Sequence, residues 1–355
     1  MRVWSKAMTA RDVANHWRRS SLAGAGGARG WSAVFWGACL WFACFCCALL
    51  AGPLQAQPAS DGAPTGVAAA LPAQVQVPSL DRVDGQALLL SGLWFPVAPG
   101  AMLGASGPRP ALVLLHGCGG AFDRQGRLSL RLRDYSALLN GQGWSVLVLD
   151  SFGARGTTQI CTQKYGTRAI TMTQRRRDAL GALAWLAQQP GVNASRLALL
   201  GWSNGGSAVL AATNRQRPEV ASAATSPRAA VAFYPGCEAD LRAGYAPSAA
   251  LLLLVGEADD WTPAAPCEAL VRSTAVSTSA TTAASAAAGP AAVPAPQISV
   301  FPGAYHGFDG LTPVVLRSDV PNGVHPGAGV HIGGQPEARA ASKAQLLDFL
   351  RTALQ

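Results

Sequence analysis

The chain has 355 residues, a length that suits one α/β domain with additional segments. Hydrophobic residues make up 49% of it and charged residues 13%, a composition that excludes a solvated, disordered chain and allows a large buried core. Of the formal net charge of +9, residues 1–56 hold +5, since they carry six basic side chains and one acidic one. The small remaining charge argues against a nucleic-acid partner.

The first 56 residues have the pattern of an export leader. A basic stretch precedes the uncharged apolar run at 31–51, and a small-residue site follows at 54–56. The apolar run exceeds the core of a typical signal peptide and is long enough to span a bilayer. We therefore expect residues 1–56 to be either a cleaved signal peptide, which leaves a periplasmic or secreted protein, or a membrane anchor. Membrane contact is expected through this segment alone.

Three further segments stand out by composition. Residues 57–79 are rich in Ala, Pro and Gln without periodicity, which predicts a flexible tether before a folded domain at 80–355. Residues 273–296 are small and uncharged, which predicts a disordered or mobile surface insertion in that domain. The run Arg175–Arg177 is interpreted as the solvated face of a helix.

Short apolar runs alternate with longer helical patterns along the folded part. The runs are continuously apolar, which indicates strands covered on both faces, as in a parallel sheet flanked by helices. They lie at 111–116, 144–150, 196–201, 229–234, 250–256 and 297–302. The helical patterns lie at 127–140, 171–189, 203–215 and 336–354. This alternation predicts an α/β fold.

Ser203 lies in the sequence GWSNG at 201–205, directly after a predicted strand and at the start of a predicted helix. A serine at this junction is held on a tight turn, and the flanking glycines remove Cβ atoms that would collide. Its hydroxyl is thereby presented above the sheet, near the positive end of the helix. We interpret Ser203 as a catalytic nucleophile, with a helix-capping serine as the alternative.

Two later loops supply an acid and a base. The loop after one predicted strand holds Glu257, Asp259 and Asp260, and the loop after the next strand holds His306. Because parallel strands end at the same edge of a sheet, Ser203, Asp259 and His306 are expected to converge there. His306 would take the serine proton while Asp259 orients the imidazole. Asp260 and Glu257 remain alternatives for the acid, and a helix cap is another role for Asp260.

The turn LHGCGG at 115–120 follows an earlier strand. Such a glycine-rich turn lets backbone N–H groups approach an oxyanion. We predict the amides of Cys118 and Asn204 as the two donors, with Gly117 as a substitute for the first. His116 is expected to support the turn and to take no part in the chemistry. A plain glycine turn is the alternative interpretation.

Taken together, the order Ser-Asp-His and the motifs HGCGG, GWSNGG, GEADDWTP and YHGF resemble the α/β-hydrolase superfamily, and within it the dienelactone hydrolase family, over about residues 80–355. The resemblance implies an α/β-hydrolase fold with a mostly parallel central sheet and helices on both faces. It also implies a triad nucleophile that attacks an ester or lactone carbonyl. The best-known members carry Cys where this chain has Ser203. Arginines that hold a substrate carboxylate are implied as well, and Arg155 is a candidate.

Four of the eight cysteines lie within 31–51, which leaves Cys118, Cys161, Cys237 and Cys267 in the folded part. An even number in an oxidising compartment predicts disulfides, and the count alone leaves three pairings open. Cys118 and Cys161 follow neighbouring strands at the site edge, and the other two follow the next pair of loops. We therefore predict the pairs Cys118–Cys161 and Cys237–Cys267. No spacing matches a metal site, so no metal is predicted.

These patterns predict an exported serine hydrolase that cleaves a small-molecule carboxylic ester or lactone through an acyl-enzyme, without a cofactor. A peptidase or acyl-transferring α/β hydrolase is an alternative, because the same triad cleaves amides. A non-catalytic envelope binding protein that keeps this fold is an alternative from another class.

Overall fold

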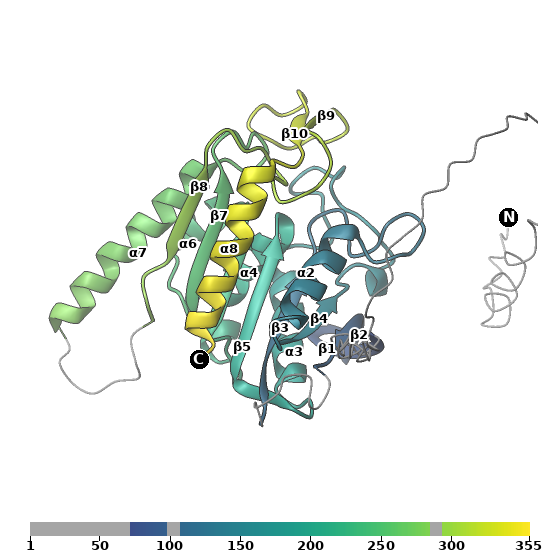
Figure 1. Cartoon of the computed structure of the whole chain (residues 1–355), viewed down its shortest axis with the longest axis vertical. Coiled ribbons are helices and arrows are strands. Elements are labelled where there is room, and N and C mark those ends of the chain that lie inside the picture. The colour runs from purple at the N-terminus through teal and green to yellow at the C-terminus, as the bar shows by residue number, and fades with distance from the viewer. Residues whose placement is uncertain (1–71, 98–106, 285–292) are drawn as a thin grey trace, which may run out of the picture. The chain divides into compact units, whose positions relative to one another are not determined.

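The computed structural model describes residues 72–97, 107–284 and 293–355. Eight strands form one sheet in the order β1-β2-β4-β3-β5-β6-β7-β8 (Figure 1). They are β1 (Ala73–Val83), β2 (Gln86–Phe95), β3 (Arg109–Leu115), β4 (Ser145–Leu149), β5 (Val192–Trp202), β6 (Ala229–Phe233), β7 (Ala250–Gly256) and β8 (Gln297–Phe301). The six strands from β4 to β8 in this order run parallel, while β1 and β2 are antiparallel. All six runs expected from the sequence are strands of this sheet.

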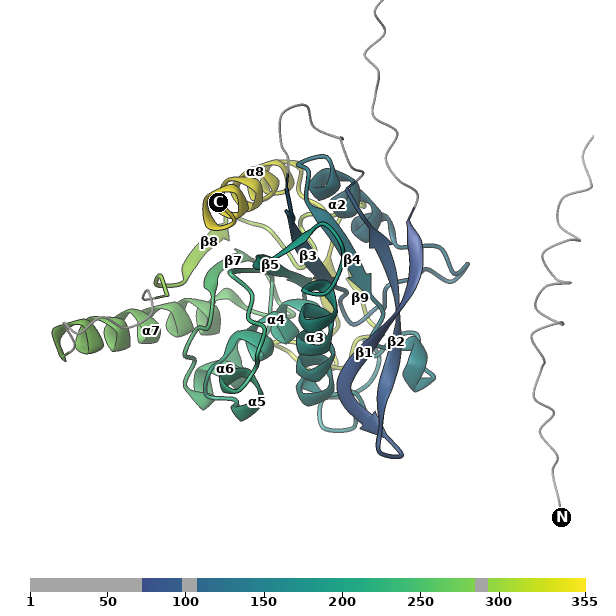
Figure 2. The same ribbon diagram turned by 90° about the horizontal axis from the view of Figure 1, so that it is seen from below.

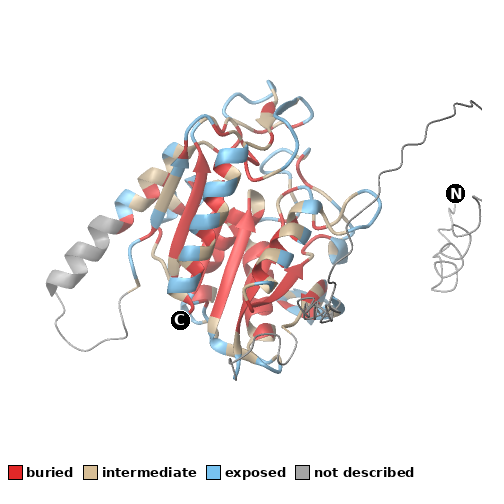
Figure 3. Cartoon of the chain, viewed as in Figure 1, coloured by how far each residue is buried: buried red, intermediate tan, exposed pale blue. Residues whose placement is uncertain are grey.

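Helices cover both faces of the sheet (Figure 2). One face packs against α3 (Met172–Leu186), α4 (Asn204–Thr213) and α7 (Ala264–Ala284), and the other against α2 (Leu130–Asn140) and α8 (Pro336–Ala353). The short helices are η1 (Gly153–Arg155), α5 (Pro218–Ala221) and α6 (Glu238–Ala243). Alternate residues of each strand serve the two layers, which accounts for the continuous apolar runs. In Figure 3 the central strands are accordingly buried.

The hairpin of β1 and β2 was not expected from the sequence. Its turn is Asp84-Gly85, with φ of 51° and 78°, the left-handed conformation that two-residue hairpins require. Only alternate side chains of β1, such as Val77 and Ser79, are buried. Because β1 begins at Ala73, the expected tether at 57–79 is wrong for residues 73–79, which belong to the sheet.

The expected insertion at 273–296 also needs correction. Helix α7 continues through Ala284, so residues 273–284 are helical. The first turns of α7 are held by the buried side chains of Cys267 and Leu270, and a helix that has already formed adds further residues at little cost. Residues 285–292 of the expected insertion lie outside the described part of the chain.

The leader at 1–56 and residues 57–71 of the expected tether also lie outside the described residues. Within the described ranges, no helix combines the length and the hydrophobicity needed to cross a bilayer.

Loops gather at the carboxyl edge of the parallel strands, where the chain leaves β3, β5, β6, β7 and β8. The long segment between β8 and α8 adds a two-stranded antiparallel sheet of β9 (Val315–Arg317) and β10 (Val330–Ile332) near this edge, as Figure 1 shows at the top. The predicted site residues lie on these loops.

Candidate active site

Ser203 is the residue between the end of β5 and the start of α4. Its φ of 53° and ψ of −118° are strained for a residue with a side chain. The glycines make this turn possible, because a Cβ on Gly201 would lie 2.2 Å from the carbonyl oxygen of Gly205, and one on Gly205 would lie 1.9 Å from that of Leu115. The expected turn between strand and helix is therefore present, and it holds the hydroxyl at the carboxyl edge.

The structure brings Ser203, His306 and Asp259 together from three separate loops. Nε2 of His306 lies 2.9 Å from the hydroxyl oxygen of Ser203, and Nδ1 lies 2.8 Å from Oδ2 of Asp259. Both His306 and Asp259 are buried. A carboxylate on Nδ1 fixes the tautomer in which Nδ1 carries the proton, so Nε2 is free to accept the hydroxyl proton.

Asp259 is held by its own loop. Its Oδ1 accepts the backbone N–H groups of Trp261 and Thr262, both at 2.8 Å. The hydroxyl of Thr262 lies 3.1 Å from Oδ2 of the same carboxylate and 3.0 Å from the carbonyl oxygen of Tyr234. These contacts leave Oδ2 directed at His306.

The two other acids considered for this role point elsewhere. The carboxylate of Asp260 accepts the backbone N–H of His331 at 2.8 Å and lies 2.7 Å from Nδ1 of the same residue. Glu257 accepts the backbone N–H of Gly303 at 2.9 Å. Asp260 thus connects strand β10 to the loop after β7, and its role is not that of a helix cap. Of the three carboxylates, Asp259 is the one that contacts His306.

The sequence patterns gave no indication of Asp309, a buried carboxylate next to the site. Asp309 accepts the indole N–H of Trp202 at 3.0 Å and the hydroxyl of Tyr234 at 2.7 Å, and Arg131 donates to it at 3.1 Å. The Tyr234 ring in turn packs against the imidazole of His306, with 4.6 Å between centroids. Burial raises the pKa of Tyr234 well above its usual value, so its hydroxyl stays protonated and donates. The partners are 75 to 178 residues away in the chain, and no local pattern marks them.

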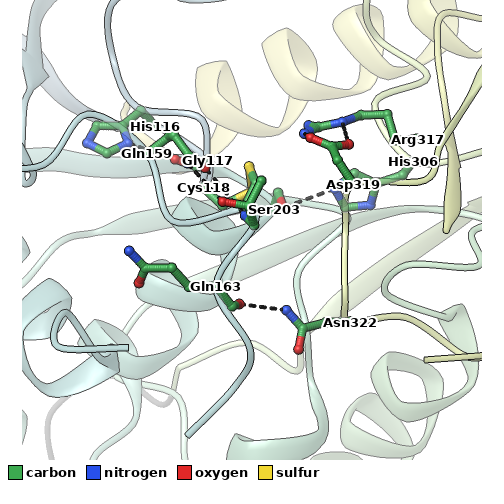
Figure 4. Close-up of a disulfide and its surroundings, with 12 residues drawn as sticks. His116, Gly117, Cys118, Gln159, Gln163, Ser203, His306, Arg317, Asp319 and Asn322 are labelled. Atoms are coloured by element: carbon green, nitrogen blue, oxygen red, sulfur yellow. Dashed lines mark hydrogen bonds and ion pairs between the residues drawn. A yellow bond between two sulfur atoms is a disulfide. The ribbon is translucent and has the colours of Figure 1, made fainter. Parts of the chain in front are cut away.

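The glycine-rich turn lies beside Ser203, as Figure 4 shows for His116, Gly117 and Cys118. A Cβ on Gly117 would lie 3.3 Å from the carbonyl oxygen of Trp202, a tight contact, and 3.5 Å from the Cβ of Ser203, so the two turns pack directly against each other. Cys118 and Asn204, the two predicted amide donors, line the same cavity as Ser203. Asn204 is the first residue of α4, where backbone N–H groups have no partner within the helix.

Two disulfides flank the site, and both predicted pairs are confirmed. Cys118 is bonded to Cys161, and Cys237 to Cys267. One residue of each pair, Cys118 and Cys237, lines the cavity. The disulfides therefore link the glycine-rich turn at 115–120 and the loop after β6 to neighbouring segments.

The cavity beside Ser203 has a volume of about 1090 Å³. Its wall includes three basic side chains, Lys164, Arg168 and Arg242, and one acidic one, Glu238. Asn322 joins two of the loops that form it: its amide donates to the carbonyl oxygen of Gln163 at 2.9 Å and accepts a backbone N–H from the same loop, again at 2.9 Å (Figure 4).

Arg155, the candidate for holding a substrate carboxylate, is placed differently by the structure. Its guanidinium donates to both oxygens of Asp178 at 2.9 Å and to Asp81 at 2.8 Å, and it also bonds the carbonyl oxygen of Ser151. It does not line the cavity. This expectation is wrong because two acids, one of them on the unpredicted strand β1, occupy the guanidinium. In the described ranges there is no group of three or more His, Cys, Asp or Glu side chains arranged to bind a metal ion.

Solved structures share this fold at low sequence identity. A dienelactone hydrolase-like promiscuous phosphotriesterase from metagenomic libraries has a TM-score of 0.52 and 18% identity, over 81% of this chain and 100% of that chain. Dipeptidyl peptidase 4 of Porphyromonas gingivalis has a TM-score of 0.52 and 17% identity, over 80% of this chain and 35% of that longer chain. No match was found among curated proteins.

At these identities the structural likeness establishes the α/β-hydrolase fold alone. The family assignment comes from the sequence, since the model of the dienelactone hydrolase family matches residues 102–354, well over half of the chain. The chain is therefore a hydrolase and belongs to the dienelactone hydrolase family.

Proposed function

We propose that the protein is a serine hydrolase of small-molecule carboxylic esters or lactones, with Ser203 as its nucleophile. The observation that carries this proposal is the 2.9 Å hydrogen bond between the Ser203 hydroxyl and Nε2 of His306. A serine hydroxyl is a weak nucleophile until a base removes its proton. Here the base is oriented by Asp259 and sits against a strained turn that presents the hydroxyl.

The reaction follows from these contacts in two halves. His306 accepts the proton as the Ser203 oxygen attacks the carbonyl carbon, and Asp259 stabilises the imidazolium. The backbone amides of Cys118 and Asn204 donate to the oxyanion of the tetrahedral intermediate. His306 then gives the proton to the leaving alcohol, which leaves an acyl group on Ser203. Water, deprotonated by the same histidine, hydrolyses the acyl-enzyme and restores the serine.

The charges on the wall of the cavity favour a substrate without positive charge. Lys164, Arg168 and Arg242 outnumber the single acid Glu238 on its wall, so the field there favours neutral or anionic molecules. A volume of about 1090 Å³ has room for an acyl part and an alcohol part of moderate size.

A fluorophosphonate probe tests the proposal directly. We expect the wild-type protein to be labelled and to hydrolyse p-nitrophenyl esters, and Ser203→Ala to lose both the label and the activity. Ser222→Ala, at an exposed serine whose hydroxyl donates to the carbonyl oxygen of Pro218, is the matched control and is expected to keep the label. Wild-type protein that folds but is neither labelled nor active would support a binding protein of the same fold. Hydrolysis of p-nitroanilides at rates comparable to esters would indicate a peptidase.

We also propose that the protein is exported. Two disulfides fit an oxidising compartment, where such bonds persist. The apolar run at 31–51 is the segment proposed to direct export, as a cleaved signal or as an anchor. N-terminal sequencing of the cell-envelope protein distinguishes the two, since a start near Gln57 indicates cleavage and an intact leader indicates an anchor.

A further inference from the structure

Arg175 is a buried cation with an unusual set of partners. Its side chain is 0% exposed, although the run of three arginines had been interpreted as a solvated helix face. Arg176 and Arg177 both donate to Glu219, whereas Arg175 is in none of the ion pairs found in the described part of the chain. Burial lowers the pKa of Arg175 to about 10, despite the attraction of two more distant carboxylates. Burying a charge without a counter-ion at contact distance costs free energy of folding. The hydrogen bonds of Arg175 therefore indicate what it does in this position.

The guanidinium of Arg175 makes both of its hydrogen bonds to His116. One nitrogen donates to the His116 carbonyl oxygen at 2.6 Å, and another lies 3.1 Å from Nε2 of the ring. The backbone N–H of Ser151 also points at Nε2, at 3.2 Å. Since both groups are donors, Nε2 must carry a lone pair and the ring proton must be on Nδ1. The Asp150 carboxylate, 3.7 Å from Nε2, is beyond hydrogen-bond distance.

This tautomer lets His116 hold the oxyanion turn. Nδ1–H of His116 donates to the carbonyl oxygen of Gly117 at 2.8 Å, and the backbone N–H of Gly120 donates to the same oxygen at 3.2 Å. In a trans peptide the C=O and N–H bonds point in opposite directions. Fixing the Gly117 carbonyl therefore also fixes the direction of the Cys118 N–H, which belongs to the same peptide. Cys118 lines the cavity together with Ser203.

We propose that Arg175 is a positioning residue for the oxyanion hole. It holds His116 in the Nδ1–H tautomer, and His116 holds the Gly117–Cys118 peptide so that its N–H faces the reacting carbonyl. Arg175 itself touches neither the substrate nor Ser203. This inference rests on the proposed function, because the peptide that Arg175 positions stabilises the transition state of that reaction.

The test compares Arg175→Met with Arg177→Met, a matched substitution on the same helix at a half-exposed, ion-paired arginine. Losing one oxyanion donor costs about 100- to 1000-fold in kcat, so a misaligned donor is expected to cost about 10- to 100-fold. For Arg175→Met we expect this fall in kcat on p-nitrophenyl acetate, with KM within about threefold of wild type. Affinity for phenylboronic acid, which forms a tetrahedral adduct on the serine, should fall by a similar factor. Arg177→Met should change none of these values.

The inference would be overturned if Arg175→Met kept the kcat and the phenylboronic acid affinity of the wild-type protein. It would also be overturned if Arg177→Met lost as much of both as Arg175→Met. A measurement on wild-type protein covers the case in which the variant does not fold. The ¹⁵N NMR signals of the His116 ring are expected to show a proton on Nδ1 and none on Nε2, and the opposite tautomer would overturn the inference. Wild-type protein without label or activity would instead reject the proposed function, so the two failures are distinguishable.

Discussion

Two buried histidines flank Ser203, and their partners differ in charge. His306 has a carboxylate on Nδ1 and the serine hydroxyl on Nε2. His116 has a backbone carbonyl on Nδ1, while Nε2 faces the guanidinium of Arg175 and a backbone N–H. A carboxylate stabilises the imidazolium that forms when a proton arrives, whereas a guanidinium opposes it. The same side chain is thus arranged as a proton acceptor on one side of the serine and as a neutral hydrogen-bond donor on the other.

Burial is common to both rings, so it does not explain this difference. For His116, burial and the nearby charge of Arg175 lower the pKa well below its usual value, and the hydrogen bond to Gly117 only partly offsets them. His116 therefore stays neutral wherever the protein is folded near neutral pH. The different surroundings of the two rings have consequences for activity and for stability that can be measured.

Removing the proton acceptor should have the largest effect. We expect His306→Ala to lower kcat for p-nitrophenyl esters by about 10⁴-fold or more, because no other group then takes the serine proton. His331→Ala is the control, since His331 contacts Asp260 and lies outside the proposed triad. It should stay within about threefold of wild type. A His306→Ala variant that kept a tenth of the wild-type kcat would contradict the role given to this ring.

Changing the carboxylate on His306 should have the next largest effect. Asp259→Asn replaces an acceptor by an amide that favours the wrong tautomer, and a fall in kcat of about 10³- to 10⁴-fold is expected. Asp260→Asn, the adjacent and isosteric change, should cost less than about threefold, because it loosens only the contact to His331. Steady-state kinetics of both variants decides the matter. If Asp260→Asn proved the more damaging, the acid would be misassigned.

The smallest effect concerns stability and His116. Because its pKa is lowered in the folded state, the unfolded chain binds a proton below about pH 6.5 that the folded protein does not. Stability from this group is therefore present above that pH and is lost as the pH falls. His116→Asn should remove this loss. The free energies of unfolding of the wild type and the variant should therefore approach each other by about 1.4 kcal/mol per pH unit as the pH falls from about 6 to 5. Urea unfolding at several pH values measures the difference, and parallel curves would show that His116 is protonated in the folded state.

Much of the site follows from patterns that are local in the sequence. Continuous apolar runs identified the parallel strands because residues buried on both faces must all be apolar. Parallel strands end at one edge, so the residues that follow them meet, which brought Ser203, Asp259 and His306 together. The same reasoning placed the four cysteines near one another, and the pairs Cys118–Cys161 and Cys237–Cys267 followed.

The direction of individual side chains required the tertiary structure. Asp259 and Asp260 are neighbours of one residue type, and only the fold of their loop shows that one faces His306 and the other His331. Arg155 could not be assigned from the sequence, because one of its acids lies on β1, a strand with one buried side and weak alternation.

The six parallel strands, the serine turn and the three loops that meet at it follow from the sequence, because strand burial and chain order are properties of contiguous residues. The tertiary structure alone decided which charges are buried and what they contact. Arg175 is 59 residues from His116, and Asp309 is 107 from Trp202. The first contact depends on how helix α3 packs against the sheet, and the second on how the segment after β8 folds against the end of β5. No local pattern in the sequence encodes that packing.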